Sequence, residues 1–311
     1  MKNILVTGGA GYIGSKLVTK LLDNNFKVTV LDKLNYSKKS LSHLAGNKRF
    51  IFIKGDVRNK KIMKSLLRKN EIIIPLAALV GAPLCEKKKS EAIAVNYESI
   101  KLLMNLVNKK HKIIYLTTNS GYGVGKKNKH CDENSPLNPI SLYGRTKVKS
   151  EKIIMKFKNS IAFRLATVFG NSYRMRSDLM VNNFVLNSLR MKKLTIYEPN
   201  FRRNFIHIND VVSAIIFSIN NFNKLKSNIY NLGLSSANLT KHMLAKKIKK
   251  RLNYLKIKIV RNKKDPDQRD YYVSNKKIEK KGFKAKISLE NGIDELIICF
   301  LNKREKIINN Y

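Results

Sequence analysis

Tyr143 and Lys147 stand four residues apart in the segment YGRTK, inside a stretch (142–156) whose apolar spacing predicts a helix. Four residues are about one helical turn, so both side chains lie on one face. An isolated tyrosine titrates near about 10, and an adjacent ammonium favours its phenolate. Thr118 follows a predicted strand (112–116), at the C-terminal edge of the sheet, and offers a hydroxyl that can bond an alcohol or ketone. In a Lys-rich chain the pattern YxxxK often arises by chance. Together with the hydroxyl of Thr118, however, Tyr143 and Lys147 predict acid–base chemistry at one carbonyl carbon.

The segment TGGAGYIG places Gly8, Gly11 and Gly14 between a predicted strand and a predicted helix. Such glycines let the backbone turn tightly against a pyrophosphate, which the amides at the helix N-terminus then hold. Asp32 ends the next strand, where a carboxylate accepts hydrogen bonds from ribose hydroxyls and repels a 2′-phosphate. The alternative is that Asp32 merely caps a loop. We predict that the chain binds NAD in preference to NADP.

Further residues at the ends of predicted strands are candidates for contact with the dinucleotide. Small side chains at the end of the fourth strand leave room for it, although plain tight packing explains the alanines equally well. Lys147 is expected to hold the nicotinamide ribose. The full set of predicted cofactor residues is Gly8, Gly11, Tyr12, Ile13, Gly14, Asp32, Asp56, Val57, Leu76, Ala77, Ala78, Thr117, Tyr143 and Lys147.

The elements that must position these residues alternate in type. Apolar, β-branched runs predict strands at 2–6, 27–31, 50–53, 72–76, 112–116 and 161–165. Helical spacing separates them at 11–23, 60–68, 91–108 and 142–156, and 125–139 reads as an irregular surface loop. This alternation predicts an α/β fold, a Rossmann-type doubly wound parallel sheet with ligands at the C-terminal strand ends.

After residue 170 the alternation becomes irregular. Helices are expected at 179–190, 211–220 and 241–251, and strands at 194–197 and 229–232. We therefore expect a NAD-binding domain at 1–170, to which 206–232 returns, and a smaller α/β substrate lobe at 171–205 and 233–311.

Composition limits the classes of function that remain. The 311 residues include 63 Lys+Arg and 21 Asp+Glu, a net charge of +42, but lysine, asparagine and isoleucine are abundant together along the chain. A/T-rich codons account for that pattern better than nucleic-acid binding does. No apolar stretch reaches the roughly 18 residues of a membrane span, and the N-terminus lacks a signal peptide. Three cysteines outside any metal-ligand spacing predict no disulfide framework, no metal site and a cytoplasmic location.

Taken together, these motifs resemble the extended short-chain dehydrogenase/reductase family, in its nucleotide-sugar epimerase and dehydratase branch. TGGAGYIG, GDV, LAALVG, TTNSGYG, YGRTK, FRLATVFG and RRNFIHINDVV occur in the family's order, followed by DPDQRDYYVSN. The resemblance implies that Asn96 braces the active-site backbone. It also implies a homodimer in which helices 91–108 and 142–156 form a four-helix bundle.

By the same resemblance, Arg203 and Arg269 look like the residues that grip a nucleotide diphosphate, and Asn182 or Asn183 like a phosphate or sugar contact. On chemistry alone, these arginines are equally well surface cations. Arg174 and Arg176 are candidates for the sugar or diphosphate end, with an exposed basic loop as the alternative. The predicted substrate set is Val80, Asn119, Ser120, Arg174, Arg176, Asn182, Asn183, Arg203 and Arg269.

The residues after Thr118 discriminate among reactions of this family. A 4,6-dehydratase has Asp-Glu there for proton transfer, whereas this chain has Asn119 and Ser120, which cannot act as acid or base near neutral pH. With dehydration disfavoured, the remaining reactions of the family are oxidation and reduction at one carbon. FGNSYRMRSDLMVNNFV and neighbouring stretches resemble the GDP-manno-heptose 4-dehydrogenases of bacterial capsule synthesis. We therefore expect C4 oxidation of a GDP-linked sugar. The alternatives are a 4-epimerase or, in another class, a silent NAD-binding regulator or nucleic-acid binder.

Overall fold

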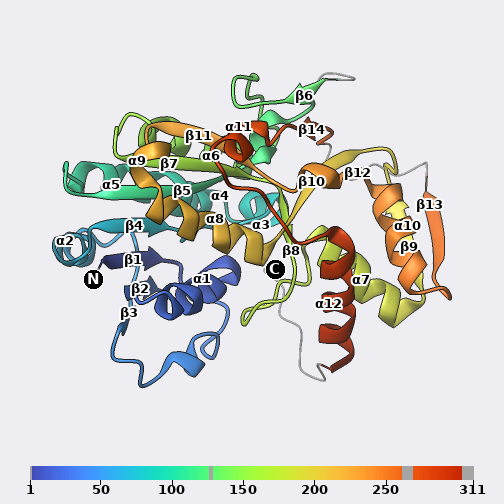
Figure 1. Cartoon of the computed structure of the whole chain (residues 1–311), viewed down its shortest axis with the longest axis horizontal. Coiled ribbons are helices and arrows are strands. Elements are labelled where there is room, and N and C mark those ends of the chain that lie inside the picture. The colour runs from blue at the N-terminus through green and yellow to red at the C-terminus, as the bar shows by residue number, and fades with distance from the viewer. Residues whose placement is uncertain (1, 126–128, 261–268, 303–311) are drawn as a thin grey trace.

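The largest unit of this computed structural model is a parallel sheet of seven strands (Figure 1), and residues 2–125, 129–260 and 269–302 are described. The strand order is β11-β7-β5-β4-β1-β2-β3, and each neighbouring pair is parallel. The order reverses between β1 and β4, which creates a crevice at their C-terminal ends. The strands are β1 (Asn3–Thr7), β2 (Lys27–Asp32), β3 (Phe50–Lys54), β4 (Ile72–Pro75), β5 (Lys112–Thr118), β7 (Ser160–Leu165) and β11 (Asn228–Leu232).

Alternate residues of the central strands enter two separate hydrophobic cores. In β1, Ile4 and Val6 pack into one core and Leu5 into the other, and all three are fully buried. A sheet that is buried on both faces needs helices on both sides, which explains the continuous apolar runs in its strands. Helices α1 (Tyr12–Asp23) and α8 (Ile208–Asn220) cover one face; α2 (Lys60–Lys69), α5 (Ser99–Leu106) and α6 (Leu142–Ile154) cover the other. The predicted Rossmann-type fold is confirmed.

Two predicted segments differ from the structure. The helix predicted at 91–108 runs without a break from α4 (Lys89–Ile93) through the π-helical segment η2 (Ala94–Glu98) into α5, and a separate helix, α3 (Ala82–Lys87), precedes it. It differs from the prediction in its π winding and in its end at Leu106, because Val107 is extended. The expected loop at 125–139 contains β6 (His130–Cys131), which pairs with β14 (Tyr272–Val273), while residues 126–128 lie outside the described part.

The rest of the chain forms smaller sheets and helices beside the main sheet. Strands β8 (Thr167–Phe169), β10 (Arg202–His207) and β12 (Asn238–Thr240) form one small sheet, and β9 (Lys193–Tyr197) pairs with β13 (Lys256–Val260). The helices here are α7 (Met180–Met191), α9 (Phe222–Leu225), α10 (Lys241–Arg251), α11 (Lys276–Lys280) and α12 (Leu289–Asn302). In the described part of the chain, the short 3₁₀ turns are η1 (Ser42–Leu44), η3 (Asn119–Tyr122) and η4 (Ser235–Ala237). The division into 1–170 with 206–232, and 171–205 with 233–311, stays a prediction.

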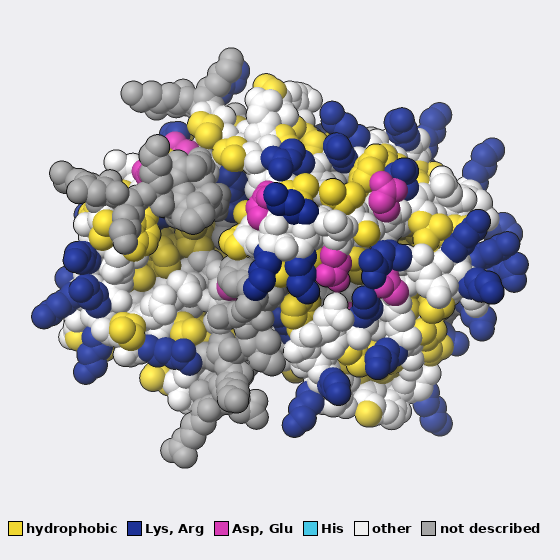
Figure 2. Space-filling view, turned by 180° about the vertical axis from the view of Figure 1, so that it is seen from behind, with side chains coloured by type: hydrophobic (Ala, Val, Ile, Leu, Met, Phe, Trp, Pro, Cys, Tyr) yellow, Lys and Arg dark blue, Asp and Glu magenta, His cyan; other side chains and the backbone are white. Residues whose placement is uncertain are grey.

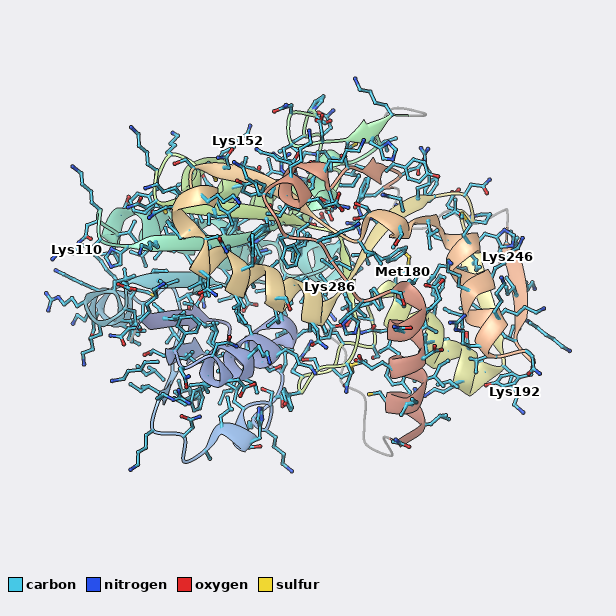
Figure 3. The ribbon with its side chains drawn as sticks, in the orientation of Figure 1. Lys110, Lys152, Met180, Lys192, Lys246 and Lys286 are labelled. Carbon is cyan, nitrogen blue, oxygen red and sulfur yellow. The ribbon has the colours of Figure 1, made fainter. Side chains whose placement is uncertain are left out.

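Basic side chains spread over the surface. The face in Figure 2 carries Lys and Arg across its whole width, with a few Asp and Glu among them. The lysines labelled in Figure 3, Lys110, Lys152, Lys192, Lys246 and Lys286, come from separate parts of the fold. Within the described ranges, we find no helix with the length and apolar content required to cross a bilayer.

Candidate active site

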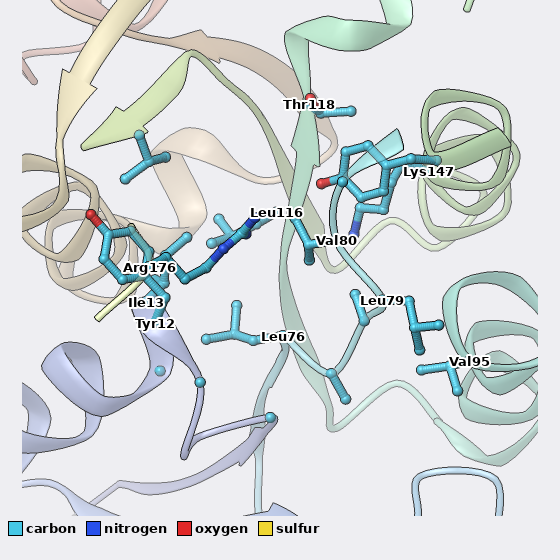
Figure 4. A pocket seen from close by; sticks show the side chains of 18 of the residues that line it. Tyr12, Ile13, Leu76, Leu79, Val80, Val95, Leu116, Thr118, Lys147 and Arg176 are labelled. Carbon is cyan, nitrogen blue, oxygen red and sulfur yellow. The ribbon is translucent and has the colours of Figure 1, made fainter. Parts of the chain in front are cut away.

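A cavity of about 320 Å³ lies at the C-terminal ends of β1, β4 and β5. Thr118 and Lys147 lie together at one side of it, and Tyr12, Ile13 and Arg176 lie at the opposite side (Figure 4). Its position coincides with the reversal of strand order, where open α/β sheets bind their ligands. The cavity wall includes the predicted cofactor residues Gly8, Gly11, Tyr12, Ile13, Gly14, Asp32, Asp56, Val57, Leu76, Ala77, Ala78, Thr117, Tyr143 and Lys147.

The glycine turn requires glycine for steric reasons. Gly8 has φ +73°, and a Cβ there would lie 2.5 Å from the backbone nitrogen of Ala77. A Cβ on Gly14 would lie 2.4 Å from the Gly8 carbonyl oxygen. Helix α1 begins directly after Gly11, and no side chain caps its first amides. The turn therefore presents backbone N–H groups and the positive end of the helix dipole, which fit a pyrophosphate.

Asp32 is held in place by backbone amides. Its Oδ2 accepts a hydrogen bond from the Ala10 N–H at 3.0 Å, and its Oδ1 accepts one from the Leu34 N–H at 2.8 Å. Burial raises the pKa of this carboxyl above its usual value. Because a carboxylate oxygen accepts more than one hydrogen bond, Asp32 both caps the loop and retains capacity for a ribose diol.

Asp56 is an ion-pair centre at the same end. Its Oδ2 lies 2.6 Å from an Arg58 nitrogen and 3.1 Å from Lys33 Nζ. The hydrogen bond from Arg58 is the main reason that the pKa of Asp56 falls well below its usual range. Asp56 therefore faces the cavity as an ionised carboxylate whose charge is balanced by Arg58 and Lys33.

At the neighbouring wall, the predicted residue Arg174 meets Tyr36, which lies in the loop after β2 and was not singled out from the sequence. The Arg174 guanidinium lies 4.5 Å from the ring centre of Tyr36, and the rings of His43 and Tyr173 stack at 4.0 Å. Arg174 is buried, and desolvation lowers its pKa to about 10. One sequence signal pointed to Tyr36, namely its place four residues after Asp32. The loop that follows this strand borders the adenosine of a bound dinucleotide in Rossmann folds.

The three predicted catalytic residues meet at the other end. Thr118, the last residue of β5, donates to Ser120 Oγ at 2.9 Å and accepts from the Ser120 N–H at 3.1 Å. Tyr143 stands in the first turn of α6, where Ser141 caps the helix by accepting from the Gly144 N–H at 3.1 Å. Lys147 is 6% exposed, and its Nζ lies 4.1 Å from the ring centre of Tyr115.

The electrostatics of this trio differ from the simplest expectation. Desolvation raises the pKa of Tyr143 to about 12 and lowers the pKa of Lys147 to about 7. We expected the Lys147 ammonium to make the phenol acidic. In the structure, the cations that lower the Tyr143 pKa are Arg176 and Arg269, because Lys147 lies against Tyr115 in a low-dielectric site.

Asn96 joins the loop after β4 to α6. Its Oδ1 accepts from the Leu79 N–H at 2.8 Å, and its Nδ2 donates to the Leu79 carbonyl at 2.9 Å. Its own carbonyl accepts a hydrogen bond from Ser150 at 2.7 Å. These bonds match the bracing role that the family resemblance implied.

The predicted substrate residues divide into two groups. Val80, Ser120, Arg174, Arg176 and Arg269 line the cavity, and Arg269 donates a hydrogen bond to Ser120 Oγ. The remaining four are not part of its wall: Asn119, Asn182, Asn183 and Arg203.

Hydrogen bonds to the backbone explain why two residues of this second group, Asn182 and Arg203, lie outside the cavity wall. Asn182 is fully buried, accepts from the Gly170 N–H at 3.1 Å and donates to the Arg176 carbonyl at 2.8 Å. Arg203 is fully buried and donates to the carbonyls of Arg202 and Arg269. They thus support the backbone of the two arginines that do line the cavity. Of the DPDQRDYYVSN motif, residues 265–268 lie outside the described part.

Comparisons with known proteins agree with this geometry. Residues 4–233 match the NAD dependent epimerase/dehydratase family. An uncharacterized UDP-glucose epimerase of Bacillus subtilis is 32% identical over 68% of this chain and 71% of its own length. The dTDP-D-glucose 4,6-dehydratase of mouse is 27% identical over 95% of this chain and 88% of its own. The structure of a UDP-glucose 4-epimerase from Thermotoga maritima, solved with UDP-glucose, superposes with a TM-score of 0.84 at 25% identity, covering 96% and 98% of the two chains.

The matched region, residues 4–233, contains every part of the site described above: the glycine turn, Asp32, and the cluster of Thr118, Tyr143 and Lys147. The predicted cofactor, NAD, is confirmed, and the comparisons show an enzyme of the NAD-dependent epimerase/dehydratase type. The chain belongs to the NAD dependent epimerase/dehydratase family.

Proposed function

We propose that this protein oxidises C4 of a nucleotide-linked sugar, with a GDP-linked manno-heptose as the substrate and bacterial surface polysaccharide synthesis as the setting. The observation that carries this proposal is the absence of a carboxylate directly after Thr118. The carboxylates in the described cavity wall are Asp32, Asp56 and Glu91. Asp32 and Asp56 belong to the cofactor end, and Glu91 pairs with Lys88 at 3.5 Å. Dehydration needs an acid and a base beside Thr118, where this chain has Asn119 and Ser120.

The residues at the reacting end support simple oxidation. Tyr143 removes the proton from the C4 hydroxyl, and Thr118 holds the oxygen through its own hydroxyl. NAD held by the glycine turn and Asp32 would supply the hydride acceptor for C4, and its positively charged ring would favour the phenolate. Lys147 holds the nicotinamide ribose. Arg176 and Arg269 lower the pKa of Tyr143 and thereby oppose the effect of burial.

The same arginines suit an anionic substrate. Arg176 reaches from the side of Tyr12 and Ile13 toward Leu116 in the middle of the cavity (Figure 4), and Asp178 orients it through an ion pair. Arg269 lies at Ser120. Guanidinium groups bind diphosphate oxygens in bidentate fashion, so we assign Arg176 and Arg269 to the nucleotide diphosphate or the sugar.

A 4-epimerase is the second candidate, and the similarity to UDP-glucose epimerases favours it. It uses the same proton and hydride transfers but returns the hydride to the opposite face of the ketone. A net dehydrogenase must instead release NADH or pass its hydride to a second substrate, for which a small 2-oxo acid is suitable.

The deciding experiment incubates the enzyme with GDP-linked and UDP-linked sugars and follows NADH absorbance together with product stereochemistry. A 4-keto sugar formed in equal amount with NADH supports the dehydrogenase. A C4-inverted sugar with no net NADH supports the epimerase. A 4-keto-6-deoxy product would contradict the assignment, because it requires the dehydration that Asn119 and Ser120 exclude.

We further propose a homodimer in which the helical stretch from α4 through η2 to α5 forms a four-helix bundle with α6, and a cytoplasmic location. Ile93, the last residue of α4, is 41% exposed, which leaves an apolar side chain available to a partner helix. The three cysteines are buried thiols, as a reducing compartment permits.

A further inference from the structure

A buried ion pair lies behind the catalytic helix. Arg164 on β7 donates to both carboxylate oxygens of Glu151 on α6, and its Nη2 lies 2.7 Å from Oε1. The two side chains are 4% and 3% exposed. A buried pair costs desolvation energy, so its place beside functional residues calls for an explanation beyond stability.

The pair joins the two elements that carry the catalytic residues. Glu151 follows Lys147 by four residues on α6 and therefore lies one turn further along the same face. Arg164 is in register with Thr117 on β5, directly before Thr118. The ion pair thus fixes the distance between the strand that ends at Thr118 and the helix that carries Tyr143 and Lys147.

A hydrogen-bond network fixes the orientation of the guanidinium itself. Arg164 Nη1 donates to Tyr122 Oη and to the Glu133 carbonyl, each at 3.1 Å. Tyr122 Oη lies 2.7 Å from Asn231 Oδ1 on β11. With the fork of Arg164 held on both sides, the Glu151 carboxylate has one defined position.

The other carboxylates near α6 have cationic partners of their own. On α4, Glu91 pairs with Lys88, and in η2, Glu98 pairs with Lys101 of α5. Burial lowers the pKa of Lys147, and Glu151 is the group that acts in the opposite direction. The elements packed around α6 carry these titratable or charged groups: Lys112 and Tyr115 of β5, Cys85, Glu86 and Lys87 of α3, Lys89 and Glu91 of α4, Tyr97 and Glu98 of η2, Lys101 of α5, Tyr122 of η3 and Arg164 of β7. Helix α6 itself carries Tyr143, Arg145, Lys149, Glu151 and Lys152 beside Lys147.

We propose that Glu151, held in place by Arg164, is a positioning residue that keeps the Lys147 side chain charged and aligned toward the bound dinucleotide. Lys147 uses its ammonium as a donor to the cofactor, and a neutral amine in this buried site loses that interaction. The proposal depends on NAD binding and not on the identity of the sugar, so it stands or falls separately from the proposed reaction.

The test measures NAD affinity by calorimetry between pH 5.5 and 9.5, at roughly one-unit steps. We expect wild-type affinity to fall as Lys147 loses its proton. In Glu151→Gln, which keeps the shape and removes the charge, the midpoint of this fall should move to lower pH by about one unit. Glu151→Asp keeps the charge but shortens the reach, so affinity should fall while the midpoint stays near that of the wild type.

Two further variants complete the design. Glu290→Gln breaks the partly exposed pair with Lys247 in the other part of the fold and should change neither affinity nor midpoint. If Glu151→Gln does not fold, Glu151→Gln with Arg164→Gln removes both charges and should move the midpoint in the same direction. The proposal would be overturned if the folded one of these two variants, Glu151→Gln or the double variant, kept the wild-type midpoint. It would also be overturned if the midpoint of Glu151→Asp moved as far as that of Glu151→Gln. In either case the role of Glu151 would be purely structural, because such a role lowers NAD affinity equally at every pH.

Discussion

Replacing Lys147 by methionine should stabilise the protein in the absence of NAD. Lys147 is buried, and desolvation lowers its pKa from 10.5 to about 7. In the unfolded chain the ammonium is hydrated, so below pH 10.5 the unfolded state binds this proton more tightly than the folded state does. The folded state therefore loses stability as pH falls from 10.5 toward 7, and the loss is complete below about 7.

The size of this effect follows from the two pKa values. The gap between 10.5 and about 7 corresponds to about 5 kcal/mol at about 1.36 kcal/mol for each pH unit. Between pH 7 and 9, wild-type stability should rise by about 2 kcal/mol from this group, and Lys147→Met should lack that rise. Changes in packing are independent of pH, so they cancel when the two slopes are compared.

Urea unfolding of the NAD-free protein at pH 6, 7, 8 and 9 measures both slopes. Lys149→Met is the matched control, because Lys149 is an exposed lysine two residues further along α6. It should leave the pH slope of the wild type unchanged. Equal slopes for the wild type and Lys147→Met would refute the argument, since they would mean that Lys147 keeps an ordinary pKa in the folded protein.

Four further predictions concern the cofactor, the chemistry, the assembly and the surface. Asp32→Ala should weaken NAD and relax the rejection of NADP in calorimetry, and a wild-type preference for NADP would contradict the assignment. Tyr143→Phe should reduce turnover by roughly 100-fold or more with NAD affinity little changed, so near-normal turnover would count against Tyr143 as the base. Light scattering at micromolar concentration should give a homodimer, not a monomer. Binding to duplex DNA should be weak and fall steeply with salt; tight, sequence-selective binding at physiological salt would show that the charge of +42 has a nucleic-acid role.

The sequence was most informative where steric or chemical rules are local. The glycine turn, Asp32 and YxxxK each depend on residues close in sequence, and each lies in the cavity wall as predicted. Strand boundaries in the parallel sheet were also predicted to within one or two residues, because strands buried on both faces leave continuous apolar runs.

Long-range contacts could not be predicted in the same way. Asn182 and Arg203 have residue types that suit a substrate, but tertiary packing directs their polar atoms to the backbone of Arg176 and Arg269. The stacking of Arg174 on Tyr36 joins positions 138 residues apart, and no local pattern encodes it. The low pKa of Lys147 likewise follows from burial against Tyr115, which only the fold defines.

The π-helical segment Ala94–Glu98 has a consequence for how this protein tolerates changes in length. A π segment accommodates an extra residue within a helix, and Asn96 lies inside it, bonded to the Leu79 backbone. Deleting one residue there would remove the extra residue and restore α-helical winding, with the turns on either side keeping their orientation. The same deletion within the regular turns of α5 would rotate the helix beyond it by about 100° and misalign it against α6. Length changes are therefore tolerated in this segment, provided that Asn96 keeps its bonds to Leu79.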